Sequence, residues 1–156
     1  MMELDEVLAL IKAMNREHVE YKLFGALALS AHGFIRATED ADFFIQPDVE
    51  NVERLKKALR SVWDDPRIDE ISSEELCGDY PAVAYYPRED DFHIDFVTRL
   101  GEAFTYDTVR AQPGTLGDIP VQVVTPDMLY EMKRDTVRYK DKIDAEALRL
   151  KFGWKK

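Results

Sequence analysis

Apolar residues recur every three or four positions in several stretches of the chain, the spacing that places them on one face of an α-helix. The first stretch predicts a helix over 3–15, and a second predicts a helix over 49–63 with Asp48 as its N-cap. A proline at one helix start and glycines at helix ends support further, less regular helices. These further helices are predicted over 26–32, over 139–151 and in a segment that starts at Pro126.

Between these helices the apolar residues form short runs or alternate with polar ones, which is typical of β-strands. Pro113-Gly114 and Gly117-Asp118 are expected to bracket a tight turn, while 104–112 has no clear pattern. Because strands and helices are interspersed, the predicted fold class is α/β (α+β), a small mixed β-sheet with helices packed on it. Strands are predicted over 21–24, 40–45, 66–71, 82–86, 91–97 and 119–124.

The length of 156 residues suits one hydrophobic core. We expect a single domain over 1–156, with a core over about 1–125 and a C-terminal helical part over about 126–152. No apolar run approaches the roughly 20 residues of a membrane helix. The acidic start of the chain also differs from a signal peptide. The expectation is therefore a cytoplasmic protein with no membrane partner.

Composition narrows the classes of partner and site. The formal net charge is −10, so most of the surface repels phosphate, and broad coating of DNA is excluded. A local basic patch near the C-terminus remains as a place for a nucleotide or an RNA end. Cys77 is the only cysteine, which excludes an internal disulfide framework and a cysteine-rich metal site.

Carboxylates occur within two predicted strands whose other residues are mostly apolar and are expected in the hydrophobic core. Asp40 and Asp42 stand two positions apart on one strand and so share one of its faces, and Asp95 lies on another strand. If the two strands are neighbours, the three groups form a set of hard oxygen ligands, the kind that Mg²⁺ takes. The alternative for each is a solvated or salt-bridged aspartate. His93, two positions before Asp95, shares its strand face and is interpreted as a packed or hydrogen-bonded histidine, with a place beside the metals as the alternative.

Gly25 joins the first predicted strand to a helix that begins at Ala26. Backbone N–H groups at a helix N-terminus have no partner within the helix and attract phosphate. The pattern therefore fits a phosphate contact at Gly25 and Ala26. It fits an ordinary strand-to-helix turn equally well.

The stretch FGALALSAHGFIRATEDADFFI resembles the signature of the polymerase-β-like nucleotidyltransferase superfamily: a glycine, a short helix and an Asp-apolar-Asp strand. Its Gly33-x-x-Arg36-x-Thr38 pattern and the C-terminal DMLYEMKRDTVRYKDKIDAEAL are similar to signatures of the minimal, AbiEii-type branch. Together with FHIDFV, these motifs cover most of the chain. The resemblance implies a nucleotidyltransferase-like fold, and it implies either a stand-alone enzyme or the toxin of a toxin–antitoxin pair.

The resemblance also implies roles for individual residues. Asp40, Asp42 and Asp95 would be the catalytic residues and the ligands of two Mg²⁺ ions, with Asp95 also accepting the proton of the attacking hydroxyl. The alternative for the cations of the C-terminal helices is pairing on the helix surface. The residues expected to bind the NTP, mainly at its phosphates, are Gly25, Ala26, Arg36, Thr38, Lys133, Arg138 and Lys140.

The expected function is Mg²⁺-dependent transfer of a nucleoside monophosphate from an NTP to a hydroxyl, with a tRNA or a protein as the acceptors considered and an antitoxin as a partner. Ala26 departs from the Gly or Ser usual at this position and removes a hydroxyl donor. A catalytically degenerate module that binds a nucleotide or a partner is therefore the alternative. A small-molecule acceptor such as an antibiotic ranks last, because the short chain shows no separate acceptor domain.

Overall fold

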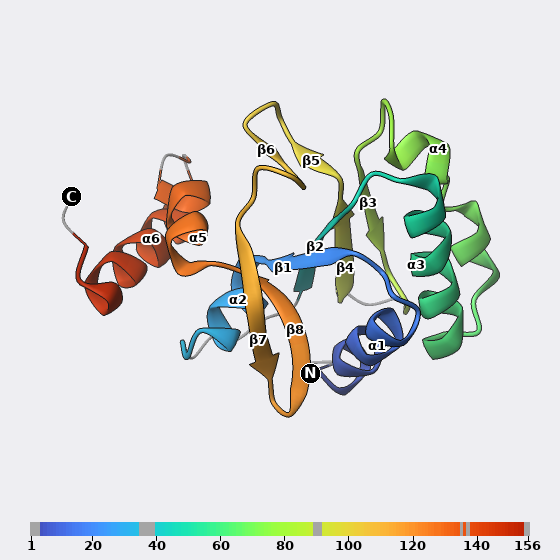
Figure 1. The fold of residues 1–156 in the computed structure, drawn as a ribbon, viewed down its shortest axis with the longest axis horizontal. Coiled ribbons are helices and arrows are strands. Elements are labelled where there is room, and N and C mark those ends of the chain that lie inside the picture. The colour runs from blue at the N-terminus through green and yellow to red at the C-terminus, as the bar shows by residue number, and fades with distance from the viewer. Residues whose placement is uncertain (1–3, 35–39, 89–91, 135, 137, 155–156) are drawn as a thin grey trace.

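The computed structural model describes residues 4–34, 40–88, 92–134, 136 and 138–154. Its largest element is a six-stranded sheet with strand order β3-β4-β2-β1-β8-β7 (Figure 1). The strands are β1 (Tyr21–Phe24), β2 (Asp40–Ile45), β3 (Ala82–Tyr85), β4 (His93–Val97), β5 (Arg99–Leu100), β6 (Phe104–Thr105), β7 (Ala111–Leu116) and β8 (Ile119–Val124). The helices are α1 (Leu4–Arg16), α2 (Gly25–Ala31), α3 (Val49–Val62), α4 (Ser73–Leu76), α5 (Pro126–Arg134), α6 (Tyr139–Phe152) and the 3-10 helix η1 (Pro66–Glu70).

The sheet is mixed, and its centre is β2. This strand runs antiparallel to β1 and parallel to β4. The register pairs Asp42 with Phe24 of β1 on one side and with Asp95 of β4 on the other. Residues paired across adjacent strands point to the same face. The two aspartates therefore lie side by side on one face of the sheet.

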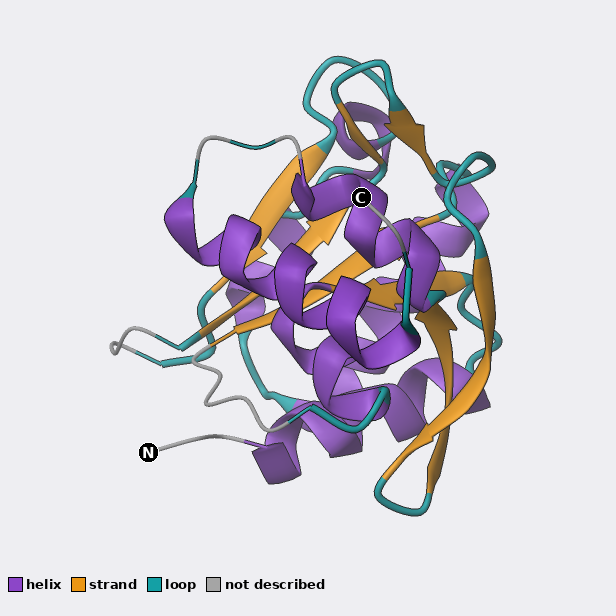
Figure 2. Cartoon of the chain, turned by 90° about the vertical axis from the view of Figure 1, so that its left-hand side faces the viewer, coloured by secondary structure: helices purple, strands orange, loops and turns teal. Residues whose placement is uncertain are grey.

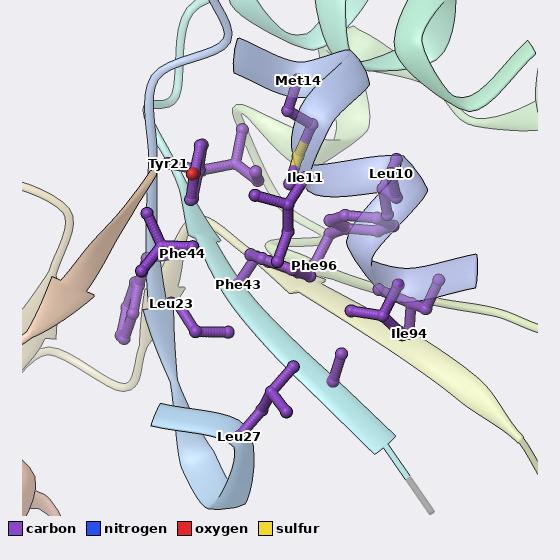
Figure 3. Close-up of a cluster of buried hydrophobic side chains, with 14 of the residues drawn as sticks. Leu10, Ile11, Met14, Tyr21, Leu23, Leu27, Phe43, Phe44, Ile94 and Phe96 are labelled. Atoms are coloured by element: carbon purple, nitrogen blue, oxygen red, sulfur yellow. The ribbon is translucent and has the colours of Figure 1, made fainter. Parts of the chain in front are cut away.

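The opposite face of the sheet carries the hydrophobic core. Side chains of Leu10, Ile11 and Met14 from α1 lie against Phe43 and Phe96 of the sheet (Figure 3). Both phenylalanines are fully buried, and their rings stack with centroids 5.8 Å apart. Helix α3 packs beside α1. Successive side chains of β2 point to opposite faces of the sheet, so Phe43 lies in this core and Asp42 lies on the other face. Neither α1 nor α3 covers that face.

The predicted helices and most predicted strands are confirmed, with ends that differ by one or two residues. The prediction of a strand over 66–71 is wrong. Asp65 caps η1 by accepting a hydrogen bond from the backbone N–H of Arg67 at 3.0 Å, and Pro66 stands at its first position. A capping aspartate followed by proline is a helix start signal, and here it prevails over a weak apolar run.

The expected turn at Pro113-Gly114 is also wrong in part. Both residues lie inside β7, and the turn is confined to Gly117-Asp118. Strand β7 is at an edge of the sheet. A proline has no backbone N–H and is tolerated on an edge strand, because one side of that strand makes no hydrogen bonds within the sheet. The unassigned stretch 104–112 contains β6 and the start of β7. No helix in the described part of the chain is long and apolar enough to cross a membrane.

Candidate active site

Asp42 and Asp95 are neighbouring carboxylates in the predicted site, paired in register and linked by a side-chain hydrogen bond. Burial raises the pKa of Asp42 to about 7, and the charge of Asp95, a hydrogen bond with its side chain and the charge of Asp40 add to the shift. Carboxylates that share a site cannot all ionise cheaply. The positive charge of Lys133 opposes the shift. This part of the sheet therefore concentrates negative charge that a cation would compensate.

Asp40 and Asp95 are linked through His93. The imidazole Nδ1 lies 3.0 Å from Asp40 Oδ1, and Nε2 lies 3.2 Å from Asp95 Oδ2. The ring of Tyr86 stacks on the imidazole with centroids 4.8 Å apart. His93 thus belongs to the carboxylate cluster and is also held by packing. It is hydrogen-bonded, as its sequence position indicated, but its partners are the predicted site residues.

Gly25 begins α2 and lies against Asp42. Its φ is +73°, in the left-handed region that suits glycine. A Cβ atom added there would lie 2.2 Å from Asp42 Oδ2 and 2.9 Å from Asp42 Cγ. The start of α2 therefore approaches the carboxylate closely only because residue 25 has no side chain. Ala26 occupies the first turn of the same helix.

Lys133, on α5, supplies a positive charge near the carboxylates. Its Nζ lies 3.3 Å from Asp141 Oδ1 and 3.2 Å from Asp144 Oδ2, both on α6. The three side chains are at most 13% exposed, and Thr136 donates a further hydrogen bond to Asp141 at 3.0 Å. An ammonium held by two buried carboxylates has a fixed position. The α5–α6 pair thus places one positive charge within electrostatic range of Asp42.

The donor set fits a divalent cation. Asp40, Asp42 and Asp95 supply oxygen atoms only, from neighbouring positions on one sheet face, which is the ligand type of Mg²⁺. Within the described ranges, however, no three acidic or imidazole groups already surround a common point. The site of the metal-free protein is therefore a group of neighbouring carboxylates, two of which are hydrogen-bonded to one imidazole.

Of the residues predicted for the site, the structure brings together Asp40, Asp42, Asp95, Gly25 and Lys133. Arg138 is 71% exposed, and its Nε lies 3.8 Å from Asp141, which is the helix-surface pairing considered as its alternative. Lys140 is exposed on α6. Arg36 and Thr38 lie outside the described residues.

Three residues of the site, His93, Asp141 and Asp144, were not among the predicted site residues, although the sequence contains signals for two of them. His93 shares the strand face of Asp95 because it stands two positions before it. Asp144 stands four positions after Lys140, the spacing of a helix-surface pair. The structure pairs Asp144 with Lys133. The position of Asp141 beside Lys133 depends on how α5 and α6 pack, and helical spacing does not reveal that.

Comparisons with known proteins agree with this geometry. Residues 21–146 match the family model described as "Nucleotidyl transferase AbiEii toxin, Type IV TA system". A crystal structure of ANT(2″)-Ia in complex with adenylyl-2″-tobramycin has a TM-score of 0.61 at 13% identity, covering 98% of this chain and 91% of that one. A solution structure of the antibiotic-resistance factor ANT(2″)-Ia has a TM-score of 0.58 at 13% identity, covering 98% and 86%. None of the curated proteins compared with the chain matches it.

Proposed function

Since the chain belongs to the AbiEii family of nucleotidyltransferases, we propose that it transfers a nucleoside monophosphate from an NTP to a hydroxyl group, with release of pyrophosphate, in a reaction that needs Mg²⁺. The observation that carries this proposal is the pairing of Asp42 with Asp95 on one sheet face, beside the start of α2. Asp42 and Asp95 are held close together, and the pKa of Asp42 is raised to about 7. A bound cation would offset the repulsion between the two carboxylates and favour their ionised forms.

In this proposal Asp40, Asp42 and Asp95 hold two Mg²⁺ ions. When bound, the ions would neutralise the carboxylates and stabilise the charge of the triphosphate. Asp95 lies beside β3, where its neighbour in register is the exposed Ala84. An acceptor hydroxyl that approaches over this small side chain would reach Asp95, which would then accept its proton.

The triphosphate would lie on the other side of Asp42. The backbone N–H groups at the start of α2 would face its phosphates, and Lys133 would contact them from α5. Ala26 adds no hydroxyl donor there, so the backbone alone serves at that position. Arg36, by resemblance, would supply a second cation. Catalysis would consist mainly of positioning and charge stabilisation at the transferred phosphorus.

The acceptor proposed first is a hydroxyl of a tRNA or a protein, with the chain as the toxin of a toxin–antitoxin pair. The structural comparison favours a second candidate. This chain covers 91% of ANT(2″)-Ia, whose crystal structure contains adenylyl-2″-tobramycin. A chain of this length and fold therefore needs no separate domain to receive a small molecule, which removes the reason for ranking such an acceptor last.

The test is a transfer assay with each α-³²P-labelled NTP in turn, with Mg²⁺ or with EDTA. The acceptors are total tRNA, the protein itself and tobramycin. The proposal expects label on one class of acceptor, from one preferred NTP, and none in EDTA. Nucleotide binding by calorimetry without transfer to any acceptor would favour the degenerate binding module. Absence of both transfer and nucleotide binding would reject the transfer reaction and the nucleotide-binding module, and would leave the module that binds a partner.

Lys133→Met is expected to lower transfer by about a hundredfold or more, because a charge-assisted contact to phosphate would be lost. It should also destabilise the protein by about 3 kcal/mol, since Asp141 and Asp144 would lose their buried partner. Single-turnover rates and urea unfolding measure the two effects. Lys57→Met is the matched control, because Lys57 makes a salt bridge with Glu17 while 72% exposed. Normal transfer by Lys133→Met would exclude the phosphate contact.

A further inference from the structure

The outer face of α6 is apolar and has no partner within the described part of the chain. Tyr139, Ile143 and Leu150 are 79%, 50% and 65% exposed. Their spacing places them within about 40° on the helix circumference, so they form one stripe, called here the α6 stripe. Nine large apolar side chains in the described ranges are exposed, and three of them form this stripe. Exposed apolar groups gathered on one helix mark a contact surface.

The other face of α6 is already used. It buries Asp141, Asp144, Ala145 and Leu148 against α5. The packing of α6 on α5 therefore uses the side opposite the α6 stripe, and it does not account for apolar side chains on the outer face. Helix α6 lies at one end of the molecule, beyond α5 (Figure 1), and crosses the front when that end is viewed directly (Figure 2). The α6 stripe thus lies where a second molecule can reach it.

Charge identifies the kind of partner. The last 19 residues contain seven of the chain's 21 Lys and Arg residues but only three of its 31 Asp and Glu residues. Two of these acids, Asp141 and Asp144, are buried. Exposed Lys142 flanks the α6 stripe on one side, and exposed Lys140 and Lys151 flank it on the other. Glu146 lies within the stripe, but its carboxylate is bound by Arg149 at 3.0 Å.

We propose that the α6 stripe binds an acidic amphipathic helix of another protein. Its apolar side chains would cover Tyr139, Ile143 and Leu150, and its flanking carboxylates would face the lysines. A basic amphipathic helix is a typical target of such acidic partners. This inference rests on α6 alone and does not depend on the proposed transfer reaction.

Other partners fit the stripe less well. Bases of a nucleic acid bind by stacking on successive aromatic rings, and Tyr139 is the one ring of the stripe, since Ile143 and Leu150 are aliphatic. A second copy of this chain would bring its own lysines against those of the first. An anionic membrane or a long RNA would also extend over the rest of the surface, which carries the excess negative charge. A single acidic helix would contact only the basic end of the molecule.

The test measures binding of two labelled peptides of about 20 residues, a length that supports an amphipathic helix. One is acidic, with Leu on one face and Glu elsewhere, and the other has Lys in place of Glu. Fluorescence anisotropy should show at least about tenfold tighter binding of the acidic peptide, with the preference reduced when salt rises from about 0.1 M to 1 M. Ile143→Lys and Leu150→Lys should each weaken it by about tenfold or more. Val49→Lys, at a residue 49% exposed on α3, should leave it unchanged.

Thermal unfolding checks that the variants fold, and Leu150→Ser replaces Leu150→Lys if the lysine variant does not. Equal affinity for both peptides, or binding that the stripe variants do not alter, would overturn the proposal. It would also be overturned by a single-stranded RNA of about 20 nucleotides that binds through the stripe when the acidic peptide does not. Sedimentation equilibrium tests whether the protein forms a dimer. A dimer that Leu150→Lys abolishes would show that the stripe binds a second copy of the chain, and it would also overturn the proposal.

Discussion

Asp42→Asn is expected to abolish nucleotidyl transfer and, at the same time, to stabilise the metal-free protein at pH 8. Transfer should fall by at least about a thousandfold, equivalent to about 4 kcal/mol of transition-state stabilisation. The amide keeps the shape of the side chain but removes the charge that would hold the metal. A variant that still transfers at the wild-type rate would exclude Asp42 as a metal ligand.

The gain in stability follows from the raised pKa of Asp42. Its pKa is about 7 in the folded protein, against an ordinary value of 3.8. Because the folded state binds the proton more tightly than the unfolded state, an ionised Asp42 destabilises the fold above pH 7. The cost shrinks as the pH falls from about 7 and vanishes below about 4. It is of the order of a few kcal/mol at pH 8.

Calorimetric melting in EDTA across this pH range measures the effect. The melting temperature of Asp42→Asn should exceed that of the wild type by several degrees at pH 8, and the two should converge near pH 4. Asp118→Asn provides the control, because Asp118 is exposed in the turn between β7 and β8. Saturating Mg²⁺ should stabilise the wild type and reverse the order of the two proteins.

Gly25→Ala is expected to reduce transfer as severely as Asp42→Asn while lowering stability. The new Cβ would lie 2.2 Å from Asp42 Oδ2, so either the carboxylate or the start of α2 must move. The φ of +73° adds a cost of about 1 kcal/mol for a residue with a side chain. Together these terms should lower the melting temperature by several degrees. The opposite stability changes of the two variants distinguish displacement of Asp42 from loss of its charge.

Gly101→Ala isolates the backbone part of this effect. Gly101 has a φ of +60°, and an added Cβ would meet no atom within 4 Å. The Gly101→Ala variant should therefore lose about 1 kcal/mol of folding stability and keep the full rate of nucleotidyl transfer. A double-mutant cycle of Gly25→Ala with Asp42→Ala measures the contact itself, since removal of the carboxylate should relieve most of the clash. Additive effects in that cycle would contradict the close approach seen in the structure.

Much of the fold was predictable because hydrophobic periodicity is a local property. The apolar stripes of α1 and α3 and the alternation in β2 are visible within about 15 residues of sequence. The two-residue spacing of Asp40 and Asp42 is equally local, and it is sufficient to place both side chains on one face of their strand. The fold class, the family and the expectation of a nucleotidyltransferase are confirmed by the sheet and by the match over residues 21–146.

What could not be predicted depends on contacts between distant segments. The register that pairs Asp42 with Asp95 joins strands about fifty residues apart. The salt bridges of Lys133 depend on the angle between α5 and α6. The misplaced turn at Pro113 shows the same limit, because only the sheet order reveals that β7 is an edge strand. The roles of the site residues stay a prediction until the variants are measured.

The contact between Gly25 and Asp42 also constrains how this protein can evolve. A side chain at position 25 is incompatible with the present place of the Asp42 carboxylate, so the glycine cannot drift while the aspartate is under selection. The reverse order is open, because loss of Asp42 would remove the nearest obstacle to a larger residue 25. A lineage that abandons the site should therefore lose Asp42 first and Gly25 afterwards. Related chains that keep the aspartate are expected to keep the glycine, whatever residue stands at position 26.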